Sequence, residues 1–327
     1  MKRIFTLKLS VAALALAVAP AVATANPTVT LKFSHEAPEM AIKGRSAKLM
    51  AELVEKYTNG SVKVDVFPGG QLIPTNEELR AAIRGQVDIV APYSSYYSSL
   101  DKGWDVYYQP MLFANAEAGM QAYNGPVGEK LLERLSSKGL KGLAMWHDGP
   151  VYAFTTGEPA ITPEAYKGLK VRVAASKPQE ALLSKVGATV ISMPATEVYM
   201  AIQQGVAQGV ITTPTYAAPA RWGEVLKTMT RISWGMGGYG VAINQRSWEK
   251  MSDEQQKGFM KAVKEAAEWN RSQSVDNIRA QEKALQDGGV KIFDPSPEQL
   301  QTWRDLAKPI WEQQSAEVQE LVKMLGK

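Results

Sequence analysis

A run of alternating strand and helix patterns occupies residues 166–214, which read Y-K-G-L-K-V-R-V-A-A-S-K-P-Q-E-A-L-L-S-K-V-G-A-T-V-I-S-M-P-A-T-E-V-Y-M-A-I-Q-Q-G-V-A-Q-G-V-I-T-T-P. The predicted strands are 169–173, 189–193 and 209–213, and the predicted helices are 178–186 and 194–204. Gly187 and Gly205 follow the two helices, as glycine often does past a helix end. This alternation predicts a parallel, doubly wound α/β sheet. Arg172 lies near the carboxyl end of the first strand, where ligands of such sheets gather.

The first half of the chain shows a similar order of elements. The predicted strands are 28–34, 62–67 and 87–91, and the predicted helices are 42–56 and 77–84. Two sets of residues also share the offsets 0, 3, 7 and 11: Pro74, Glu77, Ala81 and Gly85, and Pro194, Glu197, Ala201 and Gly205. Four matches are few, and chance remains an alternative. The repeated order nevertheless favours two similar lobes, with strand ends facing an interdomain cleft.

The first residues have the pattern of an export signal. Met1–Arg3 is basic, Val11–Val18 is nearly all apolar, and Ala23-Thr24-Ala25 is an A-x-A site. We expect cleavage before Asn26. The alternative is a membrane anchor, but the apolar run is shorter than the roughly 20 residues that a span needs.

Composition excludes several classes of protein. Removal of residues 1–25 takes away Lys2, Arg3 and Lys8, so the formal net charge falls from +4 to about +1. Near-neutrality gives no support for a nucleic-acid partner. The chain has no cysteine, which excludes a small disulfide scaffold. The remaining 302 residues suffice for two α/β lobes.

The rest of the chain shows further patterns of secondary structure. Residues 116–136 predict a helix, 140–146 a strand, and His147–Pro150 a turn at which the chain crosses between lobes. Residues 217–226 predict another helix, and the glycine-interrupted stretch 232–244 predicts the return crossing. Ser252-x-x-Gln255 is a capping box that opens a helical pattern reaching Asp287. At about 1.5 Å per residue, one such helix is roughly 50 Å long; two helices broken near 270–274 are the alternative.

Five linked motifs resemble the solute-binding proteins of TRAP transporters, the DctP-type receptors. They are F-P-G-G-Q-L at 67–72, G-L-K-V-R-V at 168–173, V-G-A-T-V at 186–190, the proline before E-V-Y at 197–199, and A-I-Q-Q-G-V-A-Q-G at 201–209. The resemblance covers nearly the whole chain after the signal. It implies a two-lobed, type II-like periplasmic-binding-protein fold with one long helix spanning both lobes. It also implies a periplasmic receptor that delivers a small organic acid to a permease of one small and one large membrane subunit, driven by an ion gradient.

Predicted lobe boundaries follow from the crossings and the resemblance. Residues 26–149 and about 238–270 form the first lobe, and residues 150–237 and about 271–327 form the second.

The resemblance assigns Arg172 to the ligand carboxylate, because the family's arginine at this position has that role. A guanidinium can hold a carboxylate through two parallel hydrogen bonds. From periodicity alone, the alternative is that Lys170 and Arg172 share the solvated face of an edge strand. The predicted ligand-binding residues are Arg172, Thr212, Thr213, Tyr216, Tyr93, Tyr152, Trp234, His35, Glu36 and Thr75.

The chain departs from the family pattern at specificity positions. Thr212 and Thr213 stand where many members have an asparagine, and Val151 stands where many have a second arginine. Tyr93, Tyr152, Tyr216 and Trp234 add aromatic surface. A monocarboxylate with an apolar or aromatic body is therefore expected to outbind dicarboxylates, uronates and sialic acids.

Enzyme motifs are missing from the sequence. It contains no H-E-x-x-H, G-x-x-x-x-G-K-[ST] or G-x-S-x-G, and its two histidines are far apart. We expect no catalytic role, no cofactor and no dedicated metal site. Two alternatives remain: a sensor that docks on a signalling receptor, and a periplasmic enzyme that acts on a carboxylic acid.

Overall fold

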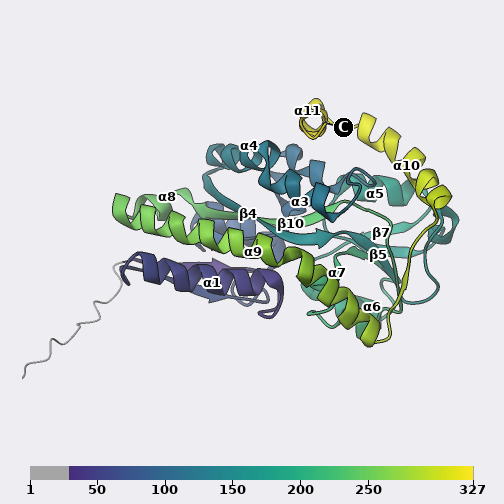
Figure 1. Cartoon of the computed structure of the whole chain (residues 1–327), viewed down its shortest axis with the longest axis horizontal. Helices are drawn as coiled ribbons and strands as arrows, with labels where there is room; N and C mark the ends of the chain where they lie inside the picture. The colour runs from purple at the N-terminus through teal and green to yellow at the C-terminus, as the bar shows by residue number, and fades with distance from the viewer. Residues whose placement is uncertain (1–28, 327) are drawn as a thin grey trace, which may run out of the picture.

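The computed structural model describes residues 29–326, so the predicted signal peptide lies outside the described residues. Two β-sheets, each with helices packed on it, form the predicted two-lobed α/β architecture (Figure 1). None of the helices in residues 29–326 combines the length and the apolarity that crossing a membrane requires.

The sheet of the first lobe has five strands in the order β2-β1-β3-β10-β4. They are β1 (Val29–Ser34), β2 (Val62–Phe67), β3 (Ile89–Val90), β4 (Leu140–Pro150) and β10 (Met236–Asn244). β1 pairs in parallel with β2 and β3, and β10 is antiparallel to β3 and β4. The helices in this part of the chain are α1 (Ile42–Tyr57), α2 (Glu78–Arg84), α3 (Ala116–Asn124), α4 (Pro126–Arg134) and the 3-10 helices η1 (Thr75–Glu77), η2 (Ser94–Ser99), η3 (Lys102–Tyr108) and η4 (Leu135–Lys138).

The sheet of the second lobe has six strands in the order β11-β9-β5-β8-β6-β7. They are β5 (Tyr152–Thr155), β6 (Lys170–Val173), β7 (Thr189–Ser192), β8 (Gly209–Thr212), β9 (Thr228–Thr230) and β11 (Lys291–Phe293). β6 pairs in parallel with β7 and β8, and β5 is antiparallel to β8 and β9. The helices between these strands are α5 (Lys177–Lys185), α6 (Val198–Gln203), α7 (Pro214–Ala217) and the 3-10 helices η5 (Pro163–Tyr166), η6 (Ala195–Glu197) and η7 (Trp222–Glu224).

The internal repeat is real at the level of the backbone. β2-β1-β3-β10 and β7-β6-β8-β5 have the same order and the same directions. Pro74 and Pro194 each cap a 3-10 turn that runs into a short helix, and Gly85 and Gly205 each follow that helix with φ of 76° and 70°. Only glycine adopts such values without steric cost, which explains its place at offset 11 in both halves.

Three local predictions were wrong. The segment 147–150 is the end of β4 rather than a turn, because it pairs with the start of β10. Residues 116–136 form α3 and α4 rather than one helix, because Pro126 cannot continue α3 and instead begins α4. Most of 217–226 is not α-helical, since α7 ends at Ala217 and only the short η7 follows it.

The two chain crossings lie side by side. Val151 donates to the carbonyl of Gly235, and Trp234 donates to the carbonyl of Val151, at 3.0 and 2.9 Å. The glycines of β10 then permit close approach. A Cβ on Gly237 would lie 2.5 Å from the Tyr93 hydroxyl and 2.7 Å from Thr213 Cγ2, so a side chain there would displace residues of both lobes.

One continuous helix, α9 (Asp253–Asp287), spans both lobes as predicted (Figure 1). It packs along α1 and β4 in the first lobe and against α7 in the second. Two of the polar residues at 270–274, Asn270 and Ser274, are buried within the continuous helix. Asn270 accepts from the main-chain N–H of His147 at 2.6 Å and donates to Ser46 Oγ at 3.1 Å. A side chain in the middle of α9 therefore ties the helix to both β4 and α1.

The remaining helices complete the fold: α8 (Gln245–Glu249), α10 (Pro297–Glu312) and α11 (Ala316–Met324). Trp303 of α10 is buried and donates to the carbonyl of Ile161 in the second lobe. The predicted boundaries place α11 in the second lobe, whereas α11 contacts η3 and α4, with an ion pair between Arg134 and Glu317.

Proline within α9 should disrupt the connection between the lobes. Ala266 is fully buried in mid-helix, so Ala266→Pro removes a helical hydrogen bond and should lower the free energy of unfolding by about 3 kcal/mol or more. Asp253→Pro is the matched control, because the first helical position tolerates proline. Urea denaturation measures both, and equal stability of the two variants would contradict the role assigned to α9.

Candidate functional site

The carboxyl ends of parallel strands from both sheets meet at one small cavity. Arg172 lies on β6 and Thr212 ends β8, while Glu36 and Tyr93 lie in the segments that follow β1 and β3. The cavity has a volume of about 20 Å³. Its lining residues are Glu36, Tyr93, Tyr96, Asp148, Arg172, Ala174, Ala195, Ile211, Thr212 and Tyr216. This volume holds about one water molecule, so any larger ligand requires the lobes to move apart.

Arg172 is a buried cation without a counter-ion. Its side chain is 2 % exposed, and Nε and Nη2 both donate to the carbonyl of Met193, at 3.0 and 2.8 Å. Within residues 29–326, no carboxylate oxygen lies within 4.0 Å of its nitrogens. Burial lowers the pKa of Arg172, but a guanidinium stays charged. An unpaired buried charge is costly, so the site favours an incoming anion.

The second cation near the cavity already has a partner. Lys43 of α1 forms a buried ion pair with Glu36 and donates to the carbonyl of Ala91 at 2.8 Å. Its ammonium also lies 4.0 Å from the centre of the Tyr239 ring. Lys43 is therefore committed to the first lobe, and Glu36 is the group that it neutralises.

Asp148 is the other carboxylate of the cavity, and it is held by hydroxyl groups. Thr213 donates to Oδ2 and Thr215 donates to Oδ1, each at 2.6 Å. Asp148 belongs to β4 of the first lobe, whereas both threonines follow β8 in the second lobe. Burial raises the pKa of Asp148, and the two hydrogen bonds oppose that effect.

Tyrosine hydroxyls supply most of the remaining polar surface. Burial raises the pKa of Tyr96 to about 12 and raises those of Tyr93 and Tyr216 as well, so all three stay protonated at neutral pH. The Tyr216 hydroxyl donates to the carbonyl of Glu36 at 3.4 Å. The cavity thus joins one cation, two carboxylates and several hydroxyl donors.

Five of the ten predicted residues line this cavity: Arg172, Thr212, Tyr216, Tyr93 and Glu36. Thr213 lies directly behind it, bonded to Asp148. His35 is fully buried next to Phe33, with ring centroids 5.8 Å apart.

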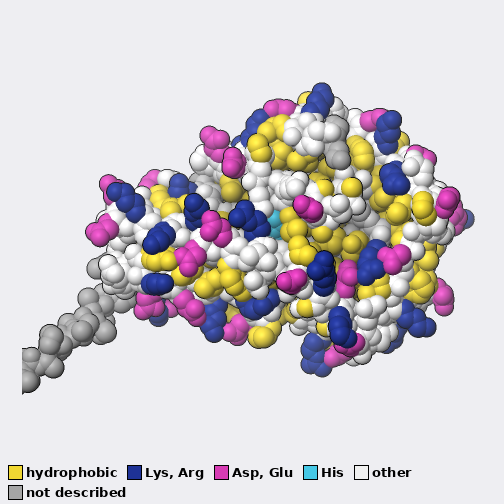
Figure 2. Space-filling model, in the orientation of Figure 1, with side chains coloured by type: hydrophobic (Ala, Val, Ile, Leu, Met, Phe, Trp, Pro, Cys, Tyr) yellow, Lys and Arg dark blue, Asp and Glu magenta, His cyan; other side chains and the backbone are white. Residues whose placement is uncertain are grey.

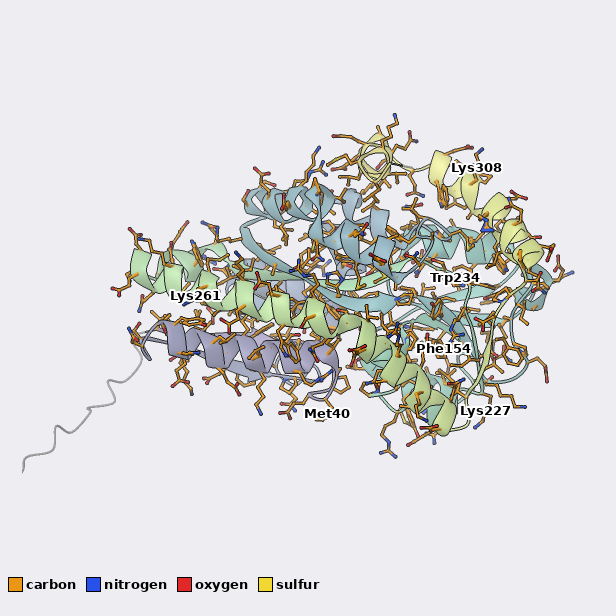
Figure 3. The ribbon with its side chains drawn as sticks, in the orientation of Figure 1. Met40, Phe154, Lys227, Trp234, Lys261 and Lys308 are labelled. Carbon is orange, nitrogen blue, oxygen red and sulfur yellow. The ribbon has the colours of Figure 1, made fainter. Side chains whose placement is uncertain are left out.

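The other three predicted residues lie elsewhere. Tyr152 lines a separate cavity of about 150 Å³ together with Arg231 and Arg304. Trp234, which is labelled in Figure 3, is fully buried. It packs against Tyr166 and Trp303, with ring centroids 5.6 and 5.5 Å away, so aromatic residues from three segments form the core there. Thr75 lines an outer groove.

Sequence reasoning missed Tyr96, Asp148, Ala174, Ala195 and Ile211. Asp148 was assigned to a turn, although its place at the expected crossing could have drawn attention to it. Tyr96 lies within Y-S-S-Y-Y, where nothing distinguishes one tyrosine from the next. The two alanines and the isoleucine have no chemical signature.

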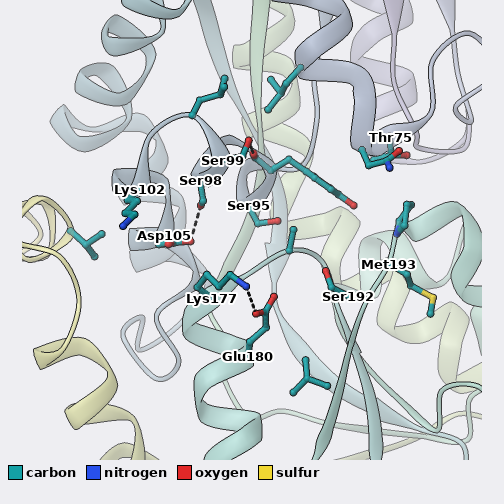
Figure 4. A pocket seen from close by; sticks show the side chains of 18 of the residues that line it. Thr75, Ser95, Ser98, Ser99, Lys102, Asp105, Lys177, Glu180, Ser192 and Met193 are labelled. Atoms are coloured by element: carbon teal, nitrogen blue, oxygen red, sulfur yellow. Dashed lines mark hydrogen bonds and ion pairs between the residues drawn. The ribbon is translucent and has the colours of Figure 1, made fainter.

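An outer groove of about 1080 Å³ adjoins the cavity (Figure 4). It lies between η1, α2 and η2 of the first lobe and α5 and β7 of the second, with the segment 313–318 at one side. Tyr96 lines both the groove and the cavity. Beside it, the Ser95 hydroxyl donates to the carbonyl of Ala174 across the lobes. Tyr96 and this bond therefore separate the cavity from the groove.

The burial of His35 predicts a pH dependence of stability. Burial and the charge of Lys43 lower the pKa of His35 to about 3, whereas an unfolded histidine titrates near 6.5. Between these values the unfolded state binds the extra proton, so stability is complete above about pH 6.5 and falls on acidification. In His35→Phe, the loss in unfolding free energy from pH 6.5 to 4.5 should be about 2 kcal/mol smaller than in the unmodified protein.

Urea titrations at the two pH values measure this difference. His147→Gln serves as a second case, because burial lowers the pKa of His147 to about 4. Identical pH dependence in all three proteins would contradict the assignment of neutral buried histidines.

Known proteins resemble this chain both in sequence and in fold. The family model for "Bacterial extracellular solute-binding protein, family 7" (DctP) matches residues 33–317. The chain is 32% identical over 298 residues to the C4-dicarboxylate-binding periplasmic protein DctP of Rhodobacter capsulatus, covering 90% of this chain and 89% of that protein. A TRAP periplasmic solute-binding protein of Shewanella oneidensis with bound succinate has a TM-score of 0.86 and 29% identity, over 91% of this chain and 98% of that one.

A third match is a TRAP periplasmic solute-binding protein of Pseudomonas aeruginosa with bound L-malate, at a TM-score of 0.82 and 26% identity, over 88% of this chain and 100% of that one. The family model matches most of the chain, in agreement with the sequence motifs that resemble this family. The repeated strand order of the two sheets, which meet at Arg172, agrees with it as well. The chain belongs to family 7 of the bacterial extracellular solute-binding proteins, the DctP family of TRAP transport receptors.

Proposed function

We propose that this protein is a periplasmic receptor that holds the carboxylate of a small organic acid on Arg172 and delivers the ligand to a TRAP permease. The observation that carries this proposal is the buried guanidinium at the meeting point of two lobes, which has no counter-ion among residues 29–326. A ligand carboxylate would complete its charge and replace the single carbonyl of Met193 as its partner. Binding of the ligand would then favour the closed arrangement of the lobes.

Relatives support the class of ligand. The proteins from Shewanella oneidensis and Pseudomonas aeruginosa are described with succinate and with L-malate, both small organic acids. The family is one of solute-binding receptors, and we assign this chain transport rather than catalysis on that basis. Positive and negative side chains are interspersed on the face of the molecule that Figure 2 shows, which suits a small ligand better than a polyanion.

The narrower proposal is a preference for monocarboxylates. The named relatives do not support it, because several of them bind C4 dicarboxylates. The lining of the cavity does support it: Arg172 is the one cation among the lining residues, beside two carboxylates. Val151, which stands where many members have a second arginine, is 1 % exposed and belongs to the core.

Loss of the guanidinium tests the central proposal. A thermal-shift screen of organic acids first identifies ligands, which stabilise the protein by mass action. Arg172→Ala should then weaken binding of the best ligand by about 2–5 kcal/mol, or about 1.5 to 3.5 decades in Kd by isothermal titration. Arg172→Lys should also weaken binding, because a point charge cannot make the two parallel bonds.

Arg221→Ala is the matched control, since this arginine of the second lobe is exposed and paired with Glu224. Its affinity should equal that of the unmodified protein. Near-normal binding by a folded Arg172→Ala protein would overturn the proposed anchor.

A further inference from the structure

We infer that Asp148 determines the charge of the ligand: it repels a second carboxylate and accepts a hydrogen bond from a neutral donor in its place. This inference rests on the proposed function, since it concerns the part of the ligand that Arg172 does not hold. Asp148 is 1 % exposed and lines the same small cavity as Arg172. Any organic acid anchored on Arg172 must therefore share this cavity with a carboxylate of the protein.

The position of the Asp148 carboxylate is fixed. Each of its oxygens accepts one threonine hydroxyl at 2.6 Å, from Thr213 and Thr215. Thr213 is itself held as the N-cap of α7, where its hydroxyl accepts from the N–H of Tyr216. While the lobes are closed, the carboxylate therefore cannot turn away from a bound ligand. Against the effect of burial, hydrogen bonding from Tyr239 also lowers the pKa of this carboxyl. Of the roughly four lone pairs of a carboxylate, about one is then left for a further donor.

The charge of Asp148 is not neutralised by the protein. Within residues 29–326, no lysine, arginine or histidine nitrogen lies within 4.0 Å of its oxygens. Lys43 acts on Asp148 only as a more distant charge and is paired with Glu36. Hydroxyl groups orient a carboxylate without cancelling its charge. This distinguishes Asp148 from Glu36, which is the other carboxylate of the cavity but has a cation at hydrogen-bonding distance.

Arg172 and Asp148 act on the same tyrosines with opposite signs. Burial is the main cause that raises the pKa of Tyr93 and of Tyr216; the negative charge of Asp148 adds to it in both, and the positive charge of Arg172 opposes it in both. These two rings therefore lie within the fields of both groups, and Tyr93 and Tyr216 line the cavity with them. The cavity is positive at the Arg172 end and negative at the Asp148 end.

A ligand that matches this arrangement has one carboxylate and a hydrogen-bond donor. A hydroxyl or amide N–H directed at Asp148 would use its free lone pair. A second carboxylate at that end would be desolvated next to a like charge, which disfavours its ionised form. Small hydroxy acids and acid amides fit this description, and succinate does not.

Matched pairs of ligands that differ by one charge test the inference. Succinamate differs from succinate in that a carboxamide of nearly the same shape replaces one carboxylate. Glutaramate and glutarate form a second such pair, and phthalamate and phthalate form a third. Isothermal titration of the full mature chain gives the ratio of the two Kd values in each pair. We expect the Kd of the amide to be lower than that of the diacid by a factor of about ten or more.

Asp148→Asn should reduce this ratio to about one or invert it, because the amide keeps the shape of the side chain and removes its charge. Asp105→Asn is the matched control. Asp105 is a buried carboxylate of the first lobe that accepts from Ser98 at 2.7 Å and lines the outer groove rather than the cavity. Its ratio should equal that of the unmodified protein. The ratio is insensitive to a general distortion of the site, which weakens both members of a pair.

Two results would overturn the inference. In the first, the unmodified protein binds the diacid as tightly as the amide in every pair. This measurement does not depend on whether any variant folds. The other is an unchanged ratio in Asp148→Asn. Failure of the proposed anchor is distinguishable, because Arg172→Ala would then leave the affinity for both members of a pair intact, whatever their ratio.

Discussion

The buried positive charge of Arg172 is the constraint on which the arrangement of the cleft depends. Arg172 is 2 % exposed, and within residues 29–326 its guanidinium donates to the carbonyl of Met193 and lies 5.9 Å from the centre of the Trp222 ring. A charge buried in this way is tolerated because both lobes enclose it. β6 supplies the arginine, and the segments after β1 and β3 of the other lobe supply the cover through Glu36, Tyr93 and Tyr96. An anion brought into this enclosure meets a charge that water does not screen, so the interaction is strong and depends on closure.

Contacts between the lobes at the cavity are hydrogen bonds. Thr213 and Thr215 reach Asp148 across the interface, and the Ser95 hydroxyl reaches the carbonyl of Ala174. Hydrogen bonds of this kind contribute only about 1 kcal/mol each, since water replaces them when the lobes part. The permanent connection is made instead by α9 and by the paired crossings at Val151 and Trp234. Weak contacts at the cavity and strong connections at α9 and the crossings are the physical conditions for hinge opening.

The site shows the limits of pattern reasoning at particular residues. Arg172 was predicted because ligands of parallel sheets gather at the carboxyl edge and because the motif around it resembles a family. Tyr93 and Thr212 were predicted from the family's specificity positions, Glu36 from its place after a strand, and Tyr216 from its aromatic ring; all four line the cavity. Asp148 was missed because strand β4 continues four residues beyond its apolar run, and only the pairing with β10 shows this. Trp234 was misplaced because aromatic character does not distinguish a core position from a cavity wall.

The sequence by itself determined the class of fold, the order of most elements in both halves and the two ends of α9. Hydrophobic periodicity, capping residues and glycines after helices are local signals, and local signals suffice for these features. Only the tertiary structure decided which strands become neighbours, which lobe α11 covers, and which polar side chains share the cavity of Arg172. Those facts depend on contacts between residues far apart in the chain. Thr213 and Asp148, for example, are 65 residues apart, and no local pattern encodes such a pairing.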